Sequence, residues 1–136
     1  MFKVNHSKTH FIEGDVRQIT KEDILPYLSG EVDGSIGGAP CHSWSEAETL
    51  KGIDDTRGQL FFAYIRIQSK FFLVENVSGM LANRHSEAVQ NILGMFEEAG
   101  YDATLTLVNA KDYGVVEEKN RVFYIGFRKD FKIACK

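Results

Sequence analysis

Two residues with reactive side chains follow apolar stretches that we predict to be strands. Cys41 comes after residues 33–37 and directly after Pro40, and Glu75 closes the continuous apolar run FFLVE. Ligands of open α/β sheets bind beyond the carboxyl ends of parallel strands, so a thiol and a carboxylate on neighbouring strand ends would face one substrate. The start of a helical turn after Pro40 would favour the thiolate, which is the nucleophilic form of cysteine. Glu75 could then share a proton with a ring nitrogen of that substrate.

Cys41 and Glu75 can also be explained by structural roles alone, without any catalysis. A cysteine in a glycine-rich turn is often a small packing residue. Glu75 and Asn76 can equally cap a helix that follows the strand. The residue types alone therefore leave catalysis and plain packing both open for Cys41 and Glu75.

The histidines offer weaker chemistry. A thiol hydrolase that pairs Cys41 with His42 or His85 is an alternative, although adjacent residues of a strand point to opposite faces, which disfavours His42 as the base. His6 and His10 lie four residues apart on a segment predicted to be extended. At that spacing the two rings do not converge on an ion, so no metal site is predicted.

Composition sets the class of protein. The chain has 136 residues, of which 43% are hydrophobic and 26% charged, as expected of one globular domain. Its 16 Lys and Arg against 19 Asp and Glu give a net charge of -3, which by itself does not indicate a nucleic-acid partner. Cys41 and Cys135 lie far apart, which favours a reducing, cytoplasmic setting. The sequence contains no secretion signal and no apolar run of about 18 residues, so no membrane span is expected.

Alternating apolar runs and helical stretches predict an α/β domain. The predicted strands are residues 10–13, 33–37, 71–75, 103–109 and 121–127. The first predicted helix is short, with Thr20 as its cap and Pro26 at its end, and two longer helices are predicted over residues 59–69 and 82–99. Residues 42–58 are predicted to form a long loop. Residues 110–120 are too few for a crossover helix, so the last two strands are predicted to be antiparallel.

Four segments, in this order, resemble the bacterial DNA (cytosine-5)-methyltransferases of restriction–modification systems. They are IGGAPCHSWSEA, GIDDTRGQLFFAYIRI, FFLVENVSGML and LVNAKDYGVVEEKNRVFYIGFRK. The resemblance runs from about Asn5 to Lys129, and the stretch after the Pro-Cys pair is most similar to the subgroup that modifies GGCC.

The resemblance implies a catalytic role for three residues. Cys41 would be the nucleophile that attacks C6 of a cytosine flipped out of double-stranded DNA. Glu75 would hold N3 and the exocyclic amine of that cytosine, and Arg121 would lie close to the nucleophile and the base. Attack at C6 activates C5 to take a methyl group from S-adenosylmethionine.

Further residues are assigned to the methyl donor and to DNA on the same basis. Asp15 corresponds to the aspartate that meets the adenine of the donor, and Pro40 also belongs to the donor site. His42, Ser43 and Lys119 are expected to contact DNA, and the loop of residues 42–58 corresponds to the segment that closes over it.

Two departures from the family pattern bear on activity. His42 follows the Pro-Cys pair where Gln or Asn is usual, and Glu117 and Lys119 replace a Gln and an Arg. The added negative charge of Glu117 should weaken DNA binding. The glycine-rich donor turn and the target-recognition domain of the family have no counterpart in residues 1–136, which we therefore expect to be a partial catalytic domain with little or no activity in isolation.

The resemblance also implies a fold. The family has a Rossmann-like sheet in the order 3-2-1-4-5-7-6, mostly parallel with a C-terminal antiparallel hairpin, and this chain would lack the first two strands. The edge of strand 33–37 would then be open, which predicts a homodimer or a complementary methyltransferase polypeptide. A non-catalytic remnant, or a subunit of a split methyltransferase, is the alternative function.

Overall fold

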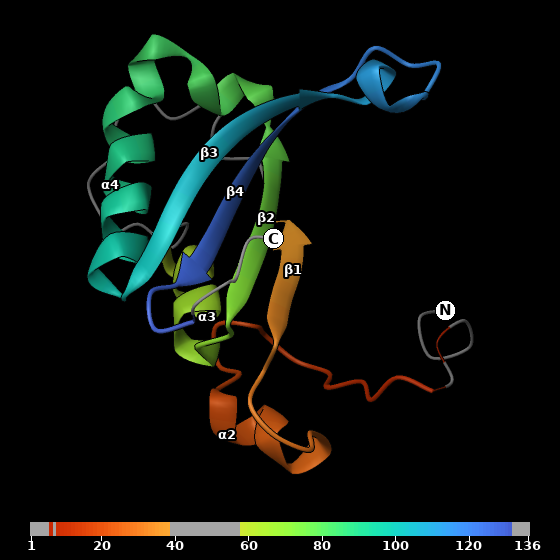
Figure 1. Ribbon diagram of the computed structural model, residues 1–136, viewed down its shortest axis with the longest axis vertical. Coiled ribbons are helices and arrows are strands. Elements are labelled where there is room, and N and C mark those ends of the chain that lie inside the picture. Colours follow the sequence, from red (N-terminus) through yellow and green to blue (C-terminus); the bar gives the residue numbers. More distant parts are fainter. Residues whose placement is uncertain (1–5, 7, 39–57, 132–136) are drawn as a thin grey trace.

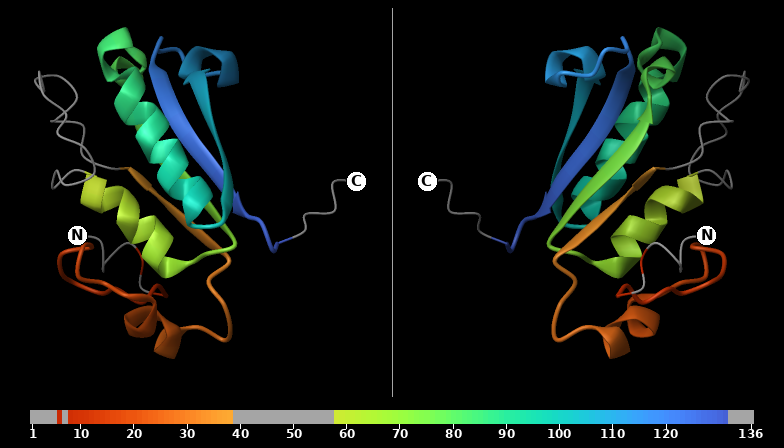
Figure 2. Two further views of the ribbon diagram at one scale, coloured as in Figure 1. Left: turned by 90° about the vertical axis from the view of Figure 1, so that its left-hand side faces the viewer. Right: turned by 90° about the vertical axis from the view of Figure 1, so that its right-hand side faces the viewer.

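The computed structural model describes residue 6, residues 8–38 and residues 58–131. Four strands form one sheet in the order β1-β2-β4-β3, and helices α3 and α4 cover one of its faces (Figures 1 and 2). The helices are α2 (Lys21–Ile24), α3 (Gly58–Ile67) and α4 (Ser86–Glu98). The strands are β1 (Gly34–Gly38), β2 (Phe71–Val77), β3 (Tyr101–Asn109) and β4 (Asn120–Arg128). The 3₁₀ turns are η1 (Leu25–Tyr27), η2 (Ser78–Leu81), η3 (Asn83–His85) and η4 (Ala110–Tyr113).

The strand directions agree with the predicted fold class. β1 is parallel to β2, whereas β4 is antiparallel to both of its neighbours, β2 and β3. β1, β2 and β3 therefore run in one direction, and β4 returns between β2 and β3. This arrangement confirms an α/β fold whose parallel strands are followed by a C-terminal antiparallel hairpin.

Two helix predictions are correct in place but differ in extent. Thr20 forms the expected capping box with Asp23, and the chain continues through Pro26 as the turn η1. The helix predicted from residue 82 begins as an α-helix only at Ser86, because the preceding residues form η2 and η3. Met80 and His85 are fully buried in these two turns, so packing against the core accounts for the tighter conformation.

The strand predicted over residues 10–13 is wrong. These residues form no strand, and the ring of His10 stacks instead on Tyr27 of η1, with 3.4 Å between ring centroids. A strand needs a partner for its backbone groups, and four residues bury too little apolar surface to hold an edge position alone. In the described part of the chain, β1 pairs with β2 only, so its outer edge is open.

The core lies between the sheet and the two long helices. Alternate residues of β2 are buried, among them Phe72 and Val74, which places Glu75 on the other face of the sheet. Phe72 stacks on Phe96 of α4 with ring centroids 4.1 Å apart. Such buried aromatic side chains each contribute about 1.5–3 kcal/mol through burial, and they hold β2 against α4.

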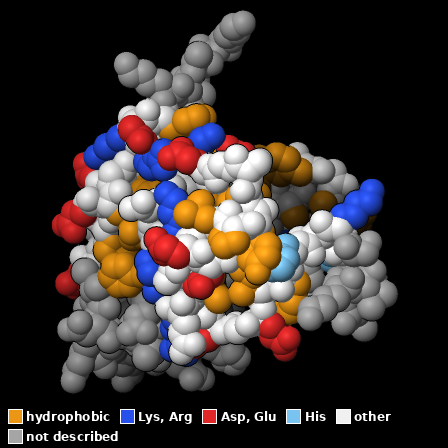
Figure 3. All heavy atoms as spheres, turned by 90° about the horizontal axis from the view of Figure 1, so that it is seen from below, with side chains coloured by type: hydrophobic (Ala, Val, Ile, Leu, Met, Phe, Trp, Pro, Cys, Tyr) orange, Lys and Arg blue, Asp and Glu red, His pale blue; other side chains and the backbone are white. Residues whose placement is uncertain are grey.

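The surface of the described residues mixes charged and apolar side chains, as the view from below illustrates (Figure 3). Within that part of the chain no helix is long and apolar enough to cross a membrane. The described side chains also include no group of three or more His, Cys, Asp or Glu that could hold a metal ion.

Candidate functional site

Glu75 lies beside the end of β1. Gly38, the last residue of β1, is paired with Glu75 in the parallel register of β1 and β2. A Cβ atom built on Gly38 would lie 3.1 Å from Oε2 of Glu75. The absence of a side chain at Gly38 therefore gives the carboxylate room to lie against the strand end.

Arg121 of β4 forms an ion pair with this carboxylate. Its Nε lies 2.7 Å from Oε1 of Glu75, and about a third of each side chain is exposed. The antiparallel register places Arg121 opposite Val77, so Arg121 and Glu75 are diagonal neighbours on one face of the sheet. Nη1 of Arg121 also donates to the backbone carbonyl of Asn120 at 2.9 Å, which orients the guanidinium group.

The pair presents complementary hydrogen-bonding groups at one strand end. A carboxylate accepts hydrogen bonds, and a guanidinium group only donates them. Together they suit a planar ligand edge that carries both an amine and a carbonyl group. Among the predicted site residues that the structure describes, Glu75 and Arg121 are in contact.

Asn76 belongs to β2, and its side chain does not cap a helix. Its side chain is 1% exposed and its Oδ1 accepts a hydrogen bond from the backbone N–H of Val77 at 2.8 Å. The turn that follows begins at Ser78 without a side-chain cap. The capping alternative for Glu75 and Asn76 is therefore wrong, because Asn76 is buried in β2 and the Glu75 carboxylate pairs with Arg121 of β4.

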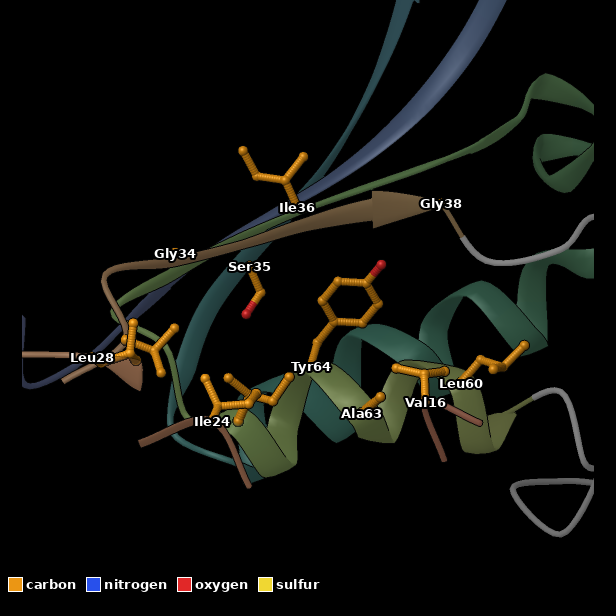
Figure 4. Close-up of a pocket in the computed structure, with 12 residues that line it drawn as sticks. Val16, Ile24, Leu28, Gly34, Ser35, Ile36, Gly38, Leu60, Ala63 and Tyr64 are labelled. Carbon is orange, nitrogen blue, oxygen red and sulfur yellow. The ribbon is translucent and has the colours of Figure 1, made fainter. Parts of the chain in front are cut away.

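A groove of about 590 Å³ lies between β1, α3 and the segment that precedes β1. Its walls are mostly apolar, and Val16 and Leu60 line the end nearest Gly38 (Figure 4). Gly38 thus borders the groove as well as the Glu75 carboxylate. Two possible ligand sites therefore meet at the carboxyl end of β1, where open α/β sheets bind their ligands.

Tyr64 brings a polar group into this groove. Its ring points from α3 toward β1 (Figure 4), and a Cβ atom at Gly37 would collide with its hydroxyl group. Burial raises the pKa of the Tyr64 phenol, so the hydroxyl group stays a neutral donor and acceptor. The apolar character of the helix around Tyr64 is visible in the sequence, but its orientation toward the groove is not.

Asp15 directly precedes Val16 of the groove wall and is paired with Arg17. Both carboxylate oxygens accept hydrogen bonds from the Arg17 guanidinium group, and Oδ1 also accepts one from the Arg17 backbone N–H at 2.9 Å. These hydrogen bonds lower the pKa of Asp15 to about 2. The sequence singles out Asp15 only through the resemblance, and nothing in the pattern predicts the part played by Arg17.

Lys119 and Glu117 both precede Arg121 on the chain. Both are exposed in the connection between η4 and β4, and the backbone N–H of Lys119 donates to Oδ1 of Asn109 at 3.3 Å. The remaining predicted site residues, Pro40, Cys41, His42 and Ser43, lie outside the described residues.

His85 is poorly suited to the base of a thiol hydrolase. It is 1% exposed, and its Nε2 accepts a hydrogen bond from Nε of Arg84 at 3.0 Å. A general base must reach the proton that it removes from a bound substrate. The burial of His85 therefore weighs against that alternative.

Comparison with known sequences identifies relatives along the whole chain. Residues 1–135 match the family described as C-5 cytosine-specific DNA methylase. The chain is 67% identical over 136 residues to the type II methyltransferase M.NgoPII of Neisseria gonorrhoeae, a match that covers 97% of this chain and 39% of the relative. It is 53% identical over 137 residues to the type II methyltransferase M.FnuDI of Fusobacterium nucleatum, covering 98% of this chain and 38% of the relative. The chain thus spans about two fifths of the length of these curated relatives.

Solved structures agree with the sheet topology. A prophage-encoded DNA modification methyltransferase of E. coli is 29% identical, with a TM-score of 0.70 over 97% of this chain and 38% of that structure. DNMT2 of Spodoptera frugiperda is 18% identical, with a TM-score of 0.71 over 99% of this chain and 40% of that structure. The second likeness shows a shared fold.

Proposed function

The chain belongs to the C-5 cytosine-specific DNA methylase family, and we propose that it supplies the nucleophile and base-binding residues of a DNA (cytosine-5)-methyltransferase of a restriction–modification system. The observation that carries this function is the Glu75–Arg121 pair at the end of β2, beside Gly38. Cys41 follows Gly38 by three residues, a length of chain that spans at most about 11 Å. A thiol on that segment is within reach of a ligand held by the pair.

Glu75 and Arg121 are proposed to hold the target cytosine. Oε1 of Glu75 is engaged by Arg121, whereas Oε2 faces the end of β1. Oε2 is therefore the oxygen available to a cytosine that has left the DNA duplex. It can accept a hydrogen bond from the exocyclic amine, and it can interact with N3 through a proton that the carboxyl group and N3 share. The donor groups of Arg121 suit the carbonyl oxygen on the same edge of the base.

Cys41 is proposed as the nucleophile. Its thiolate forms a bond to C6 of the cytosine, and the electron pair of the C5–C6 double bond moves toward C5. C5 then takes the methyl group of S-adenosylmethionine; the bond between that methyl group and sulfur breaks, and S-adenosylhomocysteine is the leaving group. Loss of the C5 proton to a base restores the double bond and expels the Cys41 thiolate.

The groove beside β1 is proposed to hold the adenine end of the methyl donor. Its apolar walls at Val16 and Leu60 suit a flat aromatic ring, and Asp15 next to them offers a hydrogen-bond acceptor for the exocyclic amine. Pro40, two residues after Gly38, is proposed to complete this side of the donor site.

DNA contacts are proposed for His42, Ser43 and Lys119. Lys119 is exposed on the same hairpin as Arg121, so its ammonium group can approach a phosphate while Arg121 stays at the base. A negative charge at Glu117, close by in the same connection, should weaken this contact.

The open edge of β1 is proposed to be covered by a second copy of the chain or by a complementary methyltransferase polypeptide. Ile36 of β1 is 73% exposed, and β1 has no partner on its outer side within the described residues. An open strand edge with an exposed apolar side chain favours pairing with another chain.

A chimera tests the function directly. Residues 1–136 replace the matching segment of M.NgoPII, which then supplies the parts of the family enzyme that have no counterpart in this chain. We expect the chimera to transfer labelled methyl groups from S-adenosylmethionine to the DNA that M.NgoPII methylates, and Cys41→Ser to abolish the transfer. A folded chimera that binds this DNA and the donor without transferring methyl groups would favour the non-catalytic alternative. The isolated chain, measured in parallel, should show little or no transfer.

A further inference from the structure

We propose that Arg17 is a positioning residue for the methyl donor: it holds the Asp15 carboxylate so that one acceptor position remains for the exocyclic amine of adenine. This inference rests on the proposed function, which places the donor adenine in the groove beside β1. It adds to that function a residue outside the motifs that carry the family resemblance.

The Arg17 guanidinium group donates hydrogen bonds to both oxygens of the Asp15 carboxylate. Its Nε lies 3.0 Å from Oδ1 and 2.9 Å from Oδ2 of Asp15, and Nη2 also donates to Oδ2. Two donors on a planar fork fix the plane of a carboxylate, which one flexible ammonium group cannot do. Asp15 therefore has a defined orientation before any ligand is present.

The same hydrogen bonds limit what Asp15 can still accept. A carboxylate has about four lone-pair positions. The Arg17 backbone N–H, its Nε–H and one Nη2–H together supply three hydrogens to Asp15. About one position is then left, which suits a single N–H of an amine better than a second cation.

The backbone around Asp15 is tied to the groove wall. The Asp15 carbonyl oxygen accepts a hydrogen bond from the Gln18 N–H at 2.9 Å, which closes a turn over these residues. Nη2 of Arg66, on α3, donates to the carbonyl oxygen of Val16 at 2.9 Å. Since α3 also carries Leu60, this hydrogen bond ties Val16, the residue next to Asp15, to the helix that forms the other apolar wall.

The acceptor at Asp15 is ionised at neutral pH, because even the ordinary pKa of its carboxyl, 3.8, is low. The Arg17 hydrogen bonds lower this pKa further, to about 2. An ionised carboxylate accepts hydrogen bonds and donates none. Adenine presents an amine as a donor at this edge, whereas hypoxanthine presents a carbonyl oxygen, so the carboxylate should favour adenine and repel hypoxanthine.

The test compares two ligands that differ at this one group. Binding of S-adenosylhomocysteine and of S-inosylhomocysteine is measured by calorimetry on the M.NgoPII chimera, in which the donor site is complete. We expect Arg17→Met to weaken binding of the adenosyl compound about tenfold and that of the inosyl compound much less. Arg17→Met should add nothing to Asp15→Asn in the double variant, because Arg17 acts through Asp15.

Two controls separate positioning from general effects. Lys111→Met removes a positive charge from the exposed turn η4 and should leave the preference for the adenosyl compound unchanged. Arg17→Lys keeps the positive charge but lacks the planar pair of guanidinium donors, so it should recover only part of the preference for the adenosyl compound. Thermal unfolding of every variant verifies that the fold is intact.

The outcomes distinguish this inference from the function on which it rests. Equal losses for both ligands in Arg17→Met, additive losses in the double variant, or full recovery by Arg17→Lys would each overturn the role of Arg17 while methyl transfer by the unaltered chimera persists. Failure of the unaltered chimera to bind S-adenosylhomocysteine would overturn the donor site and this inference together.

Discussion

Two buried tyrosines differ in whether their hydroxyl group has a partner. The Tyr101 hydroxyl donates to the carbonyl oxygen of Ser69 at 2.7 Å, whereas the Tyr124 hydroxyl has no hydrogen-bond partner in the described part of the chain. Burial accordingly raises the pKa of Tyr124 far above its ordinary value. A buried polar group without a partner costs stability, and removing it recovers that cost.

We therefore expect Tyr124→Phe and Tyr101→Phe to have opposite effects on the free energy of unfolding. Tyr124→Phe should raise it by about 1 kcal/mol or leave it unchanged, and Tyr101→Phe should lower it by about 1 kcal/mol. Urea denaturation of both variants measures the difference. Equal destabilisation by the two substitutions would show that the Tyr124 hydroxyl is satisfied.

The hydrogen bonds from Arg17 also change the pH at which the Asp15 carboxyl titrates. Its pKa lies at about 2 in the folded chain, below the ordinary value of 3.8, mainly because of the Arg17 hydrogen bonds. A depressed pKa means that the ion pair stabilises the fold above about pH 4 and that this stabilisation is lost as the pH falls toward 2. Because the pair is exposed, salt should screen its contribution.

Carboxyl NMR shifts recorded against pH test this directly. We expect Asp15 to titrate near pH 2 in the unaltered chain and to return toward 3.8 in Arg17→Met. An Asp15 carboxyl that titrates near 3.8 with Arg17 present would contradict the observed fork.

Single residues also show what the sequence alone predicts and what it does not. The resemblance assigns Glu75 and Arg121 to one site, and the structure places the two side chains in an ion pair. Asp15 and Arg17 are only two residues apart, but their spacing does not show that the two side chains turn toward each other. The missing partner of the Tyr124 hydroxyl depends on which side chains from other segments surround it.

At the scale of elements, the apolar run FFLVE and the antiparallel hairpin were predictable because each has a strong local pattern. β2 alternates buried and partly exposed residues over its whole length. The predicted strand 10–13 failed because strand formation depends on a partner edge, which no local pattern can provide. The late start of α4 has a similar cause, since buried Met80 and His85 hold the preceding turns.

Two glycines provide a matched test of how the elements pack. A Cβ atom at Gly126 of β4 would overlap the buried ring of Phe72, whereas Gly94 in α4 has no neighbouring atom within 4 Å. Gly126→Ala should lower the free energy of unfolding by about 1–3 kcal/mol through overpacking. Gly94→Ala should raise it by about 0.5–1 kcal/mol, because alanine is the better helix former.

Denaturation of these two variants checks the close approach of β4 to β2. A stable Gly126→Ala variant would mean that the Phe72 ring moves aside easily. The opposite sign expected for Gly94→Ala verifies that the assay resolves changes of this size.

At the scale of the whole molecule, the open edge of β1 predicts association. Light scattering at micromolar concentration should report about twice the chain mass of 15.4 kDa. Ile36→Lys should shift the population toward monomer, because a charged side chain on an edge strand opposes pairing with another chain. A monomeric unaltered chain over this concentration range would contradict the proposed dimer.

Methyl transfer by this chain depends most on Cys41 and Glu75 acting on one cytosine under the proposed function. A DNA duplex with 5-fluorocytosine at the target position tests this, because fluorine at C5 blocks the proton loss that releases the cysteine. The M.NgoPII chimera, incubated with this DNA and S-adenosylmethionine, should form a covalent complex that mass spectrometry locates at Sγ of Cys41, and Glu75→Gln should slow its formation. A chimera that binds both ligands but forms no covalent bond, or that forms the bond at another residue, would contradict the account.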